Sequence, residues 1–183
     1  LVDLHSVQGY DQLAGIGLAW SGSEFLISWE EVPPPCNVLC PAAPHLIRAA
    51  RVRSDLTSID AQPMILEDRE RLTGETYAVW EGETFLVIWS GSYPEHVLVG
   101  TRITREGAVG EPEVIATASP DSFIDGRLVR FGSGAALFIR ERSFVHPWPV
   151  AVRIVAFESG TALSGISDLP AVPLAANLGP DLA

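Results

Sequence analysis

The stretch GIGLAWSGSEFLISW (residues 15–29) recurs in altered form as ETYAVWEGETFLVIW (residues 75–89). In both copies two tryptophans lie nine residues apart, on either side of a four-residue polar turn that contains glycine. Aromatic, β-branched and other apolar residues flank this turn, and such a pattern predicts a tight antiparallel hairpin. A chain that repeats a hairpin of this kind is expected to stack similar small sheets.

Both faces of the predicted hairpin are apolar, which restricts the fold further. A strand with one face in water usually alternates apolar with polar residues. We therefore expect each sheet to have neighbours on both sides. In the first copy one face carries Leu18, Trp20, Phe25, Ile27 and Trp29, and the other carries Ala19 and Leu26. In the second copy one face carries Ala78, Trp80, Phe85, Val87 and Trp89, and the other carries Tyr77, Val79, Leu86 and Ile88.

Three arginines indicate the length of the repeat. Arg51, Arg102 and Arg153 follow one another at intervals of 51 residues, and each is followed by a β-branched residue. The tryptophan pairs are instead separated by 60 residues, and a Pro-rich insertion within 30–45 accounts for the difference. The agreement of these landmarks favours duplication of a unit of about 51 residues.

A third copy follows in degenerate form at 128–141, where a period of 51 makes Phe131 the counterpart of Trp80. Polar or small residues replace apolar or aromatic ones at several positions of this copy, which indicates a unit whose neighbour is missing or unusual. These residues are Arg130, Ala136 and Arg140.

Four short strands fit into each unit, and the sequence predicts an all-β array of three four-stranded antiparallel blades, as in β-propellers. In the second unit the strands are expected at about 76–80, 85–89, 98–104 and 113–117. Propellers typically have about four to eight blades, so three repeats are expected to belong to a larger propeller or to assemble into a ring. We expect an orphan fourth strand at 1–7, repeats at about 8–66, 67–117 and 118–175, and a tail at 176–183.

The phrases LAWSGSEFLISW…IRAARVRSD and AVWEGETFLVIW…LVGTRITREG…PEVIATA resemble the repeat of large bacterial extracellular β-propeller proteins. The shared features are an aromatic-glycine hairpin and a strand of the Gly-x-Arg-Val type, across roughly residues 15–155. These residues pack sheets, so the resemblance implies a fold far more than an activity. It also implies a secreted or cell-surface protein, with any signal peptide outside this chain.

Charge and motifs exclude several functions. The formal net charge is −11 and the isoelectric point is near 4.7, which argues against a nucleic-acid partner, because such partners require a basic surface. No apolar run approaches the roughly 18 residues of a membrane span. Nucleophile-elbow, zinc-protease, phosphate-loop and dinucleotide-binding motifs are missing from the sequence. We therefore expect neither catalysis nor a cofactor.

Cys36 and Cys40 lie in the Pro-rich insertion. A local disulfide is our preferred interpretation, and it would favour an oxidising compartment. Free thiols remain an alternative. A zinc site is a weaker one, because zinc requires about four ligands and only His45 is nearby in sequence.

Histidines and arginines recur at corresponding places in the units. His45, His96 and His146 precede the three arginines, and we interpret them as structural or surface residues, since equivalent positions on stacked sheets lie about 10 Å apart and are too distant to share a metal. The arginines are expected to pair with an acid or to stack on Trp29 or Trp89. Ligand binding is the alternative for both sets.

Loops at one rim carry the variation in length and the candidates for partner binding. This rim comprises 30–48, 90–97 and 141–149, and packing against neighbouring blades would explain its aromatic residues equally well. The predicted partner-binding residues are Tyr93, His96, Phe144, His146 and Trp148.

These features predict a non-catalytic, extracytoplasmic scaffold or adhesion module that works through protein contacts. Its partner is expected to be another protein, or further copies or segments that complete the propeller. The first alternative is a glycan-binding propeller, in which Tyr93 and Trp148 stack on sugar rings. A propeller glycosidase completed by missing blades is a weaker alternative.

Overall fold

The computed structural model describes residues 12–33, 45–69, 72–91, 96–119, 122–143, 150–163 and 172–174. All of its regular elements are β-strands, which confirms the predicted all-β class. The strands are β1 (Gln12–Trp20), β2 (Glu24–Val32), β3 (His45–Arg53), β4 (Met64–Arg69), β5 (Leu72–Trp80), β6 (Thr84–Gly91), β7 (Val97–Thr104), β8 (Glu113–Thr117), β9 (Ser122–Phe131), β10 (Gly134–Ser143), β11 (Val150–Phe157) and β12 (Val172–Leu174).

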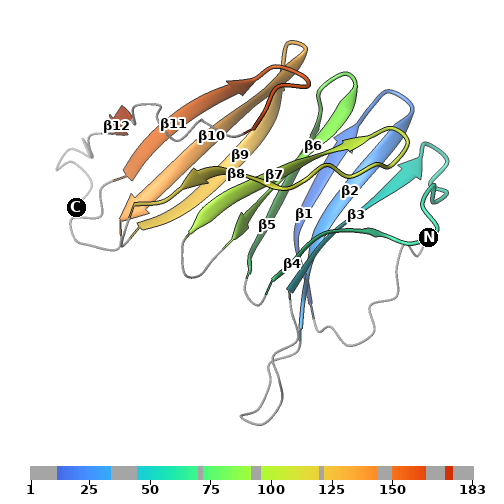
Figure 1. Ribbon diagram of the computed structural model, residues 1–183, viewed down its shortest axis with the longest axis horizontal. Coiled ribbons are helices and arrows are strands. Elements are labelled where there is room, and N and C mark those ends of the chain that lie inside the picture. The colour runs from blue at the N-terminus through green and yellow to red at the C-terminus, as the bar shows by residue number, and fades with distance from the viewer. Residues whose placement is uncertain are drawn as a thin grey trace, which may run out of the picture.

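The strands form three separate antiparallel sheets of four, as predicted (Figure 1). The first sheet contains β1 to β4, the second β5 to β8 and the third β9 to β12, and within each sheet neighbours in sequence are neighbours in space. The second sheet lies between the other two. Among the described strands no sheet closes on itself.

Short turns with glycine close the first two hairpins. The amide of Ser21 donates to the carbonyl of Glu24 at 3.0 Å, and the amide of Glu81 donates to the carbonyl of Thr84 at 2.9 Å. Gly22 and Gly82, which follow the two donors, have φ values of 99° and 106°. Only glycine adopts this conformation without steric cost, so the turn residues place both tryptophan hairpins in the same register.

The second sheet is buried on both faces, which confirms the prediction made from its apolar pattern. One face, with Trp80, Phe85 and Trp89, packs against Ala19 and other residues of the first sheet. The opposite face packs against the third sheet. That contact joins Val79, Leu86, Ile88 and Leu98 to Ala135, Leu137, Ile139 and Val155.

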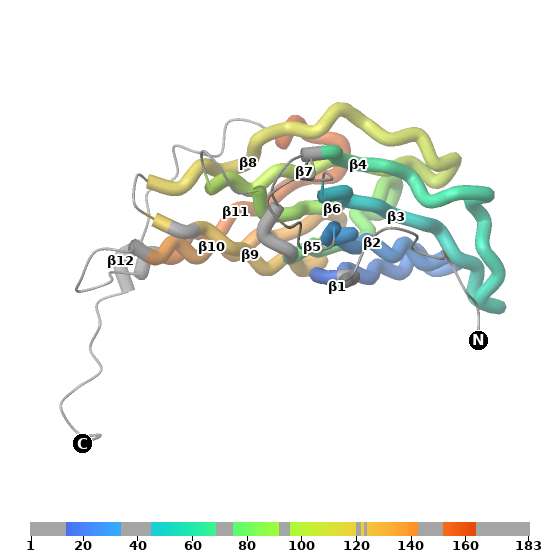
Figure 2. Tube along the Cα trace, turned by 90° about the horizontal axis from the view of Figure 1, so that it is seen from below, coloured from blue at the N-terminus to red at the C-terminus, as the bar shows by residue number. Residues whose placement is uncertain are grey.

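The most extensive contact between the first two sheets is the approach of β1 to β5. Gly17 allows this approach, because a Cβ atom there would lie 3.0 Å from the backbone nitrogen of Ala78 and 2.5 Å from Oγ of Ser28. Next to it the buried hydroxyls of Ser28 and Thr76 are 3.0 Å apart and hydrogen-bonded. Figure 2 shows β1, β5 and β9 along one side of the molecule and β4, β7 and β8 along the other.

The third hairpin differs from the prediction in its register. Phe131 pairs with Gly134 beside the turn and is 68% exposed, so the prediction that it corresponds to Trp80 is wrong. Trp80 pairs one residue further from its turn, with Phe85, and the third-sheet residue in that position is Arg130. The register slips by one residue because the third turn consists of Gly132 and Ser133, one residue earlier than the 51-residue spacing requires.

Several predicted features lie outside the described residues. They include the orphan strand at 1–7, the tail at 176–183 and most of the Pro-rich insertion with Cys36 and Cys40. The disulfide therefore stays a prediction, as do the repeat boundaries.

Candidate functional site

One of the five predicted partner-binding residues lies in the described part of the chain. His96 directly precedes β7, is half-buried, and its carbonyl accepts a hydrogen bond from the amide of Ala118 at 2.8 Å. Tyr93, Phe144, His146 and Trp148 lie outside the described residues. Partner binding at this rim therefore remains a prediction.

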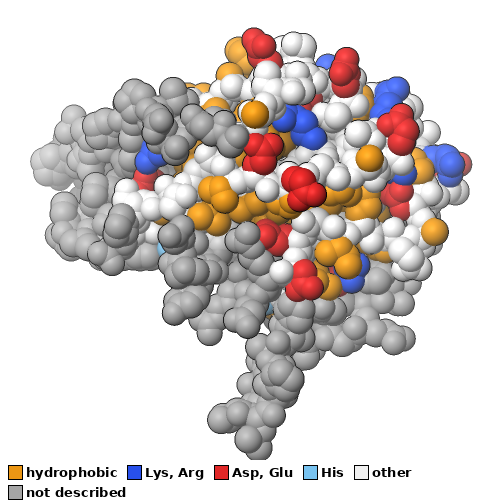
Figure 3. Space-filling view, viewed as in Figure 1, with side chains coloured by type: hydrophobic (Ala, Val, Ile, Leu, Met, Phe, Trp, Pro, Cys, Tyr) orange, Lys and Arg blue, Asp and Glu red, His pale blue; other side chains and the backbone are white. Residues whose placement is uncertain are grey.

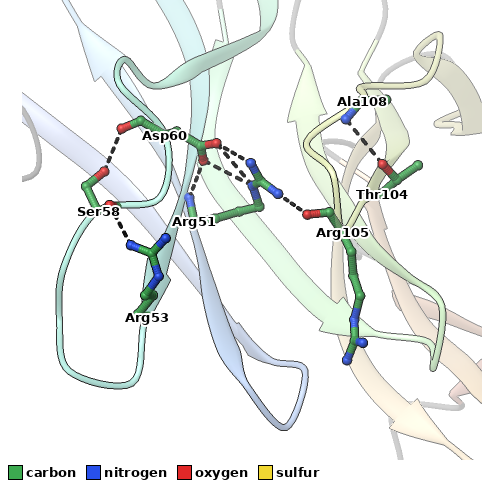
Figure 4. Close-up of polar contacts among 7 residues, drawn as sticks. All are labelled: Arg51, Arg53, Ser58, Asp60, Thr104, Arg105 and Ala108. Carbon is green, nitrogen blue, oxygen red and sulfur yellow. Dashed lines mark hydrogen bonds and ion pairs between the residues drawn. The ribbon is translucent and has the colours of Figure 1, made fainter.

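The recurring arginine Arg51 joins the first sheet to the second (Figure 4). Its guanidinium pairs with the carboxylate of Asp60 at 2.5 Å, and both side chains are almost buried. The hydrogen bond that Arg51 donates to Asp60 raises the pKa of Arg51 in spite of burial, which acts in the opposite direction. The same guanidinium donates to the carbonyl of Arg105, in the turn after β7. The acid thus holds the arginine in place for a contact across the sheets.

Arg102 repeats this arrangement one sheet further along. Its Nε lies 2.6 Å from the buried carboxylate of Glu81, and its terminal nitrogens donate to the carbonyls of Thr161 and Glu158 beyond β11. Pairing with an acid is thus confirmed for Arg51 and Arg102. The cation–aromatic contacts in the described residues involve other arginines, Arg105 over Trp80 and Arg127 over Tyr77.

Arg153 also pairs with an acid, but in a different position of its sheet. It opposes Ile139 in β10, as Arg48 opposes Trp29 in β2. Its guanidinium lies 2.7 Å from Glu141, and Arg48 makes the corresponding pair with Glu31 at 2.8 Å. The equal spacing of the three arginines in the sequence therefore does not give three equivalent positions.

The position that corresponds to Arg102 in the third sheet is Ala156. Arg102 opposes Leu86 in the second sheet, and Ala156 opposes Ala136, which lies at the same distance from its turn. An alanine cannot make the contact that joins the first sheet to the second and the second to the third. The face of the third sheet that points away from the second sheet therefore lacks this arginine.

His45 has a structural environment. Its Nδ1 lies 2.6 Å from the carboxylate of Glu30, which is buried. Among the described residues, no three His, Cys, Asp or Glu side chains are placed to hold a metal ion together. The contact with Glu30 agrees with the structural interpretation of this histidine.

A pocket of about 250 Å³ lies between β5 and the third sheet. In it the guanidinium of Arg140 forms two hydrogen bonds with Asp125 through Nε, at 3.1 and 3.0 Å. The hydroxyl of Tyr77 donates to the carboxylate of Glu75. Burial and this bond raise the pKa of Tyr77, so its hydroxyl keeps its proton. The lining residues are Glu75, Tyr77, Asp125, Gly126, Arg127, Phe138, Ile139, Arg140 and Val152.

Apolar side chains are exposed on the two outward faces of the stack. The first-sheet outer face carries Ile16, Leu18, Trp20 and Ile65, and the third-sheet outer face carries Val129, Phe131, Phe138 and Ile154. The exposed fractions of these side chains run from 40% for Phe138 to 71% for Ile16. Exposed apolar patches of this kind often mark contact surfaces.

On the face drawn in Figure 3, charge does not single out a binding surface. Figure 3 shows acidic and basic side chains interspersed around a band of apolar side chains on the side in view. The described residues include no helix with the length and apolarity needed to cross a bilayer.

Sequence reasoning missed the pocket and the first-sheet outer face, and it indicated the third-sheet outer face only through the departures noted in the third unit. The pocket combines residues from four strands of two sheets, so no local motif reveals it. Exposure of the first-sheet outer face was not predicted, because every sheet was expected to have neighbours on both sides. Arg130 and Arg140, noted in the sequence as departures from the pattern, were the available signal for the third sheet, and both are exposed.

Together these features define a class of protein, an all-β chain of stacked four-stranded sheets with apolar outward faces. Comparison with known proteins goes no further, because neither a family model nor a curated protein sequence matches the chain.

Proposed function

We propose that the chain is a non-catalytic β-propeller scaffold or adhesion module outside the cytoplasm, which works through contacts with proteins. Stacking of four-stranded meanders in chain order is how propeller blades are arranged. The arginine contact that recurs between successive sheets supports the same arrangement, since one unit docks on the next in a repeated way.

The observation that carries this proposal is the likeness between the exposed outer face of the first sheet and the corresponding buried face of the second sheet. Trp20 and Phe25 occupy the same hairpin positions as Trp80 and Phe85, with ring centroids 4.4 Å and 4.7 Å apart in the two pairs. Trp80 is covered by a neighbouring sheet and is 5% exposed, whereas Trp20 is 42% exposed. A face built for packing but left open favours protein contact as the function.

The placement outside the cytoplasm rests on two features of the sequence. One is the resemblance to bacterial extracellular propeller repeats, and the other is the pair Cys36 and Cys40, read as a local disulfide. The net charge of −11 agrees with a soluble surface that avoids polyanions.

Glycan binding is the second candidate, and the pocket beside Tyr77 favours it. Tyr77 supplies aromatic surface, while Asp125 and Arg140 supply a fixed acceptor and donor pair. Binding pockets for small ligands commonly combine apolar walls with a few oriented polar groups. This pocket would suit a single sugar ring.

The proposal is tested by capturing partners on the immobilised chain. The bait is offered secreted and surface proteins of the producing cells, and bound proteins are quantified by mass spectrometry. The matched control bait carries Tyr93→Ala and Trp148→Ala in the predicted rim. Proteins enriched on the unaltered bait and lost from the control support a scaffold that uses this rim.

A glycan array run in parallel separates the two candidates. Clear binding that disappears in Tyr77→Ala or Trp148→Ala would replace the protein-contact proposal with the glycan-binding one. Capture of no protein above background, together with a blank array, would count against both.

A further inference from the structure

We propose that the first-sheet outer face of one chain receives the third-sheet outer face of a second copy, so that chains associate head to tail. This inference rests on the proposed function and names the partner of one of its surfaces. The contact is heterologous, because two different faces meet, and such contacts produce rings or open chains of subunits.

The contacts between sheets inside the molecule show what kind of surface would cover the first-sheet outer face. Counted from the hairpin turns, Leu18 and Trp20 occupy the positions of Ala78 and Trp80 in the second sheet. Around Trp80 that face is covered by the opposite face of the preceding sheet, which carries Ala19 and other small or aliphatic residues. A surface that packs on Trp20 in the same way would be the opposite face of another four-stranded sheet of this kind, placed before the first sheet.

The third sheet presents such a face to the outside. Counted from their turns, Val129 and Phe138 occupy the positions of Val79 and Ile88. In the second sheet Val79 and Ile88 belong to the face that packs on the following sheet. The third-sheet outer face is thus the face that a following unit would cover, and the first-sheet outer face is the one that a preceding unit would cover. The two are complementary ends of one stack.

The contact between copies is expected to be weaker than the contacts between sheets inside the chain. Arg51 and Arg102 each donate across an internal contact, whereas Ala156 stands in the corresponding place on the third-sheet outer face. Burial of the apolar side chains supplies the driving force without this polar contact. Association should therefore be reversible and should depend on concentration.

Sedimentation velocity over a wide range of concentration tests the proposal with the full chain. We compare the unaltered protein with Trp20→Asp, which alters the first-sheet outer face, and Phe138→Asp, which alters the third-sheet outer face. An aspartate at the centre of a packed contact is expected to weaken association by at least about 30-fold. Circular dichroism and urea unfolding confirm that each variant is folded.

Mixing the two variants is the decisive step. Each variant alone keeps one intact face and should stay monomeric, but Trp20→Asp retains the third-sheet outer face and Phe138→Asp retains the first-sheet outer face. An equimolar mixture should therefore form dimers and nothing larger. The double variant Trp20→Asp with Phe138→Asp should stay monomeric alone.

Several outcomes would overturn the proposal. The proposal is wrong if the chain is monomeric at every concentration. It is also wrong if either single variant still self-associates, because two like faces would then be in contact. A mixture that stays monomeric would also overturn the proposal. These results would not contradict the proposed function if partner capture through the rim succeeds. Conversely, the capture experiment can fail while head-to-tail association is still observed.

Discussion

The guanidinium of Arg51 in the first sheet donates a hydrogen bond to the backbone carbonyl of Arg105 in the second (Figure 4). Asp60, in the segment between β3 and β4 of the first sheet, positions the guanidinium for this contact. Arg102 makes the same kind of contact to the carbonyl of Thr161, which follows β11 of the third sheet. A side chain held by an acid thus fixes how each sheet meets the next, in addition to the apolar contact between them.

Removal of the Arg51 side chain is expected to destabilise the fold. In Arg51→Met the carboxylate of Asp60 loses its partner in a nearly buried place, which should lower the free energy of unfolding by about 3 kcal/mol. Arg53→Met is the matched control, because Arg53 lies on the same strand but is exposed, and its change should stay within about 0.5 kcal/mol. Urea unfolding measures both, and equal effects would contradict the role assigned to Arg51.

The two hairpin tryptophans that precede the turns should differ in their contribution to stability. Trp80→Ala removes a side chain that is 5% exposed and should cost about 3–5 kcal/mol. Trp20→Ala, at the corresponding position of the first sheet, should cost about 1–2 kcal/mol, because much of that side chain already contacts water. Unfolding is measured in the Phe138→Asp background, which prevents association from adding to the effect of Trp20. Equal costs would show that Trp20 is covered in solution.

Gly17→Ala should force the first two sheets apart. The added Cβ would lie 2.5 Å from Oγ of Ser28 and 3.0 Å from the backbone of Ala78, and crowding of this kind typically costs about 1–3 kcal/mol. Leu18→Ala is the control on the same strand, since Leu18 points to the exposed outer face and its loss should be the smaller one. A stable Gly17→Ala variant would mean that the sheets can separate without cost.

Stability should fall in acid through Glu141. Burial opposes ionisation of this carboxylate, but hydrogen bonds from Ser119 and the pair with Arg153 outweigh it and lower the pKa of Glu141 below its ordinary value of 4.5. A pKa that is lower in the folded state stabilises the fold above about pH 4.5, and this stabilisation is lost as the pH falls through the lowered pKa.

Glu141→Gln should remove this part of the pH dependence. Thermal unfolding between neutral pH and pH 3 measures it, and the variant should lose less stability than the unaltered protein over that interval. Arg153→Met is the partner variant and should also flatten the profile, because it removes one of the interactions that lower the pKa of Glu141. Identical slopes in all three proteins would refute the assignment.

Much of the local structure follows from the sequence. Polar turns with Gly22 and Gly82 between apolar runs fix two hairpins, because glycine at positive φ permits the turn and residues of period two define the faces. The strands predicted in the second unit agree with β5 to β8 to within a few residues. Apolar residues on both faces of that unit correctly indicated a sheet between two others.

The sequence did not reveal which residues of different sheets meet. Arg51 and Arg102 were expected to pair with an acid, yet their contacts with the carbonyls of Arg105 and Thr161 join positions more than 50 residues apart. The pocket beside Tyr77 likewise combines two sheets. Such contacts depend on how the sheets are placed relative to one another, and no local pattern of residues specifies that placement.

The third sheet shows most clearly which features follow from the sequence and which depend on the tertiary structure. The sequence by itself predicted a third, degenerate copy of the hairpin at 128–141, with apolar residues on both sides of a glycine-containing turn. It did not determine which face turns inward, because a slip of one residue in register moves every side chain of a strand to the other face. The turn at Gly132 and Ser133 makes that slip relative to the 51-residue spacing. Packing on the second sheet then buries Leu137 and Ile139 and leaves Phe131 and Phe138 facing outward.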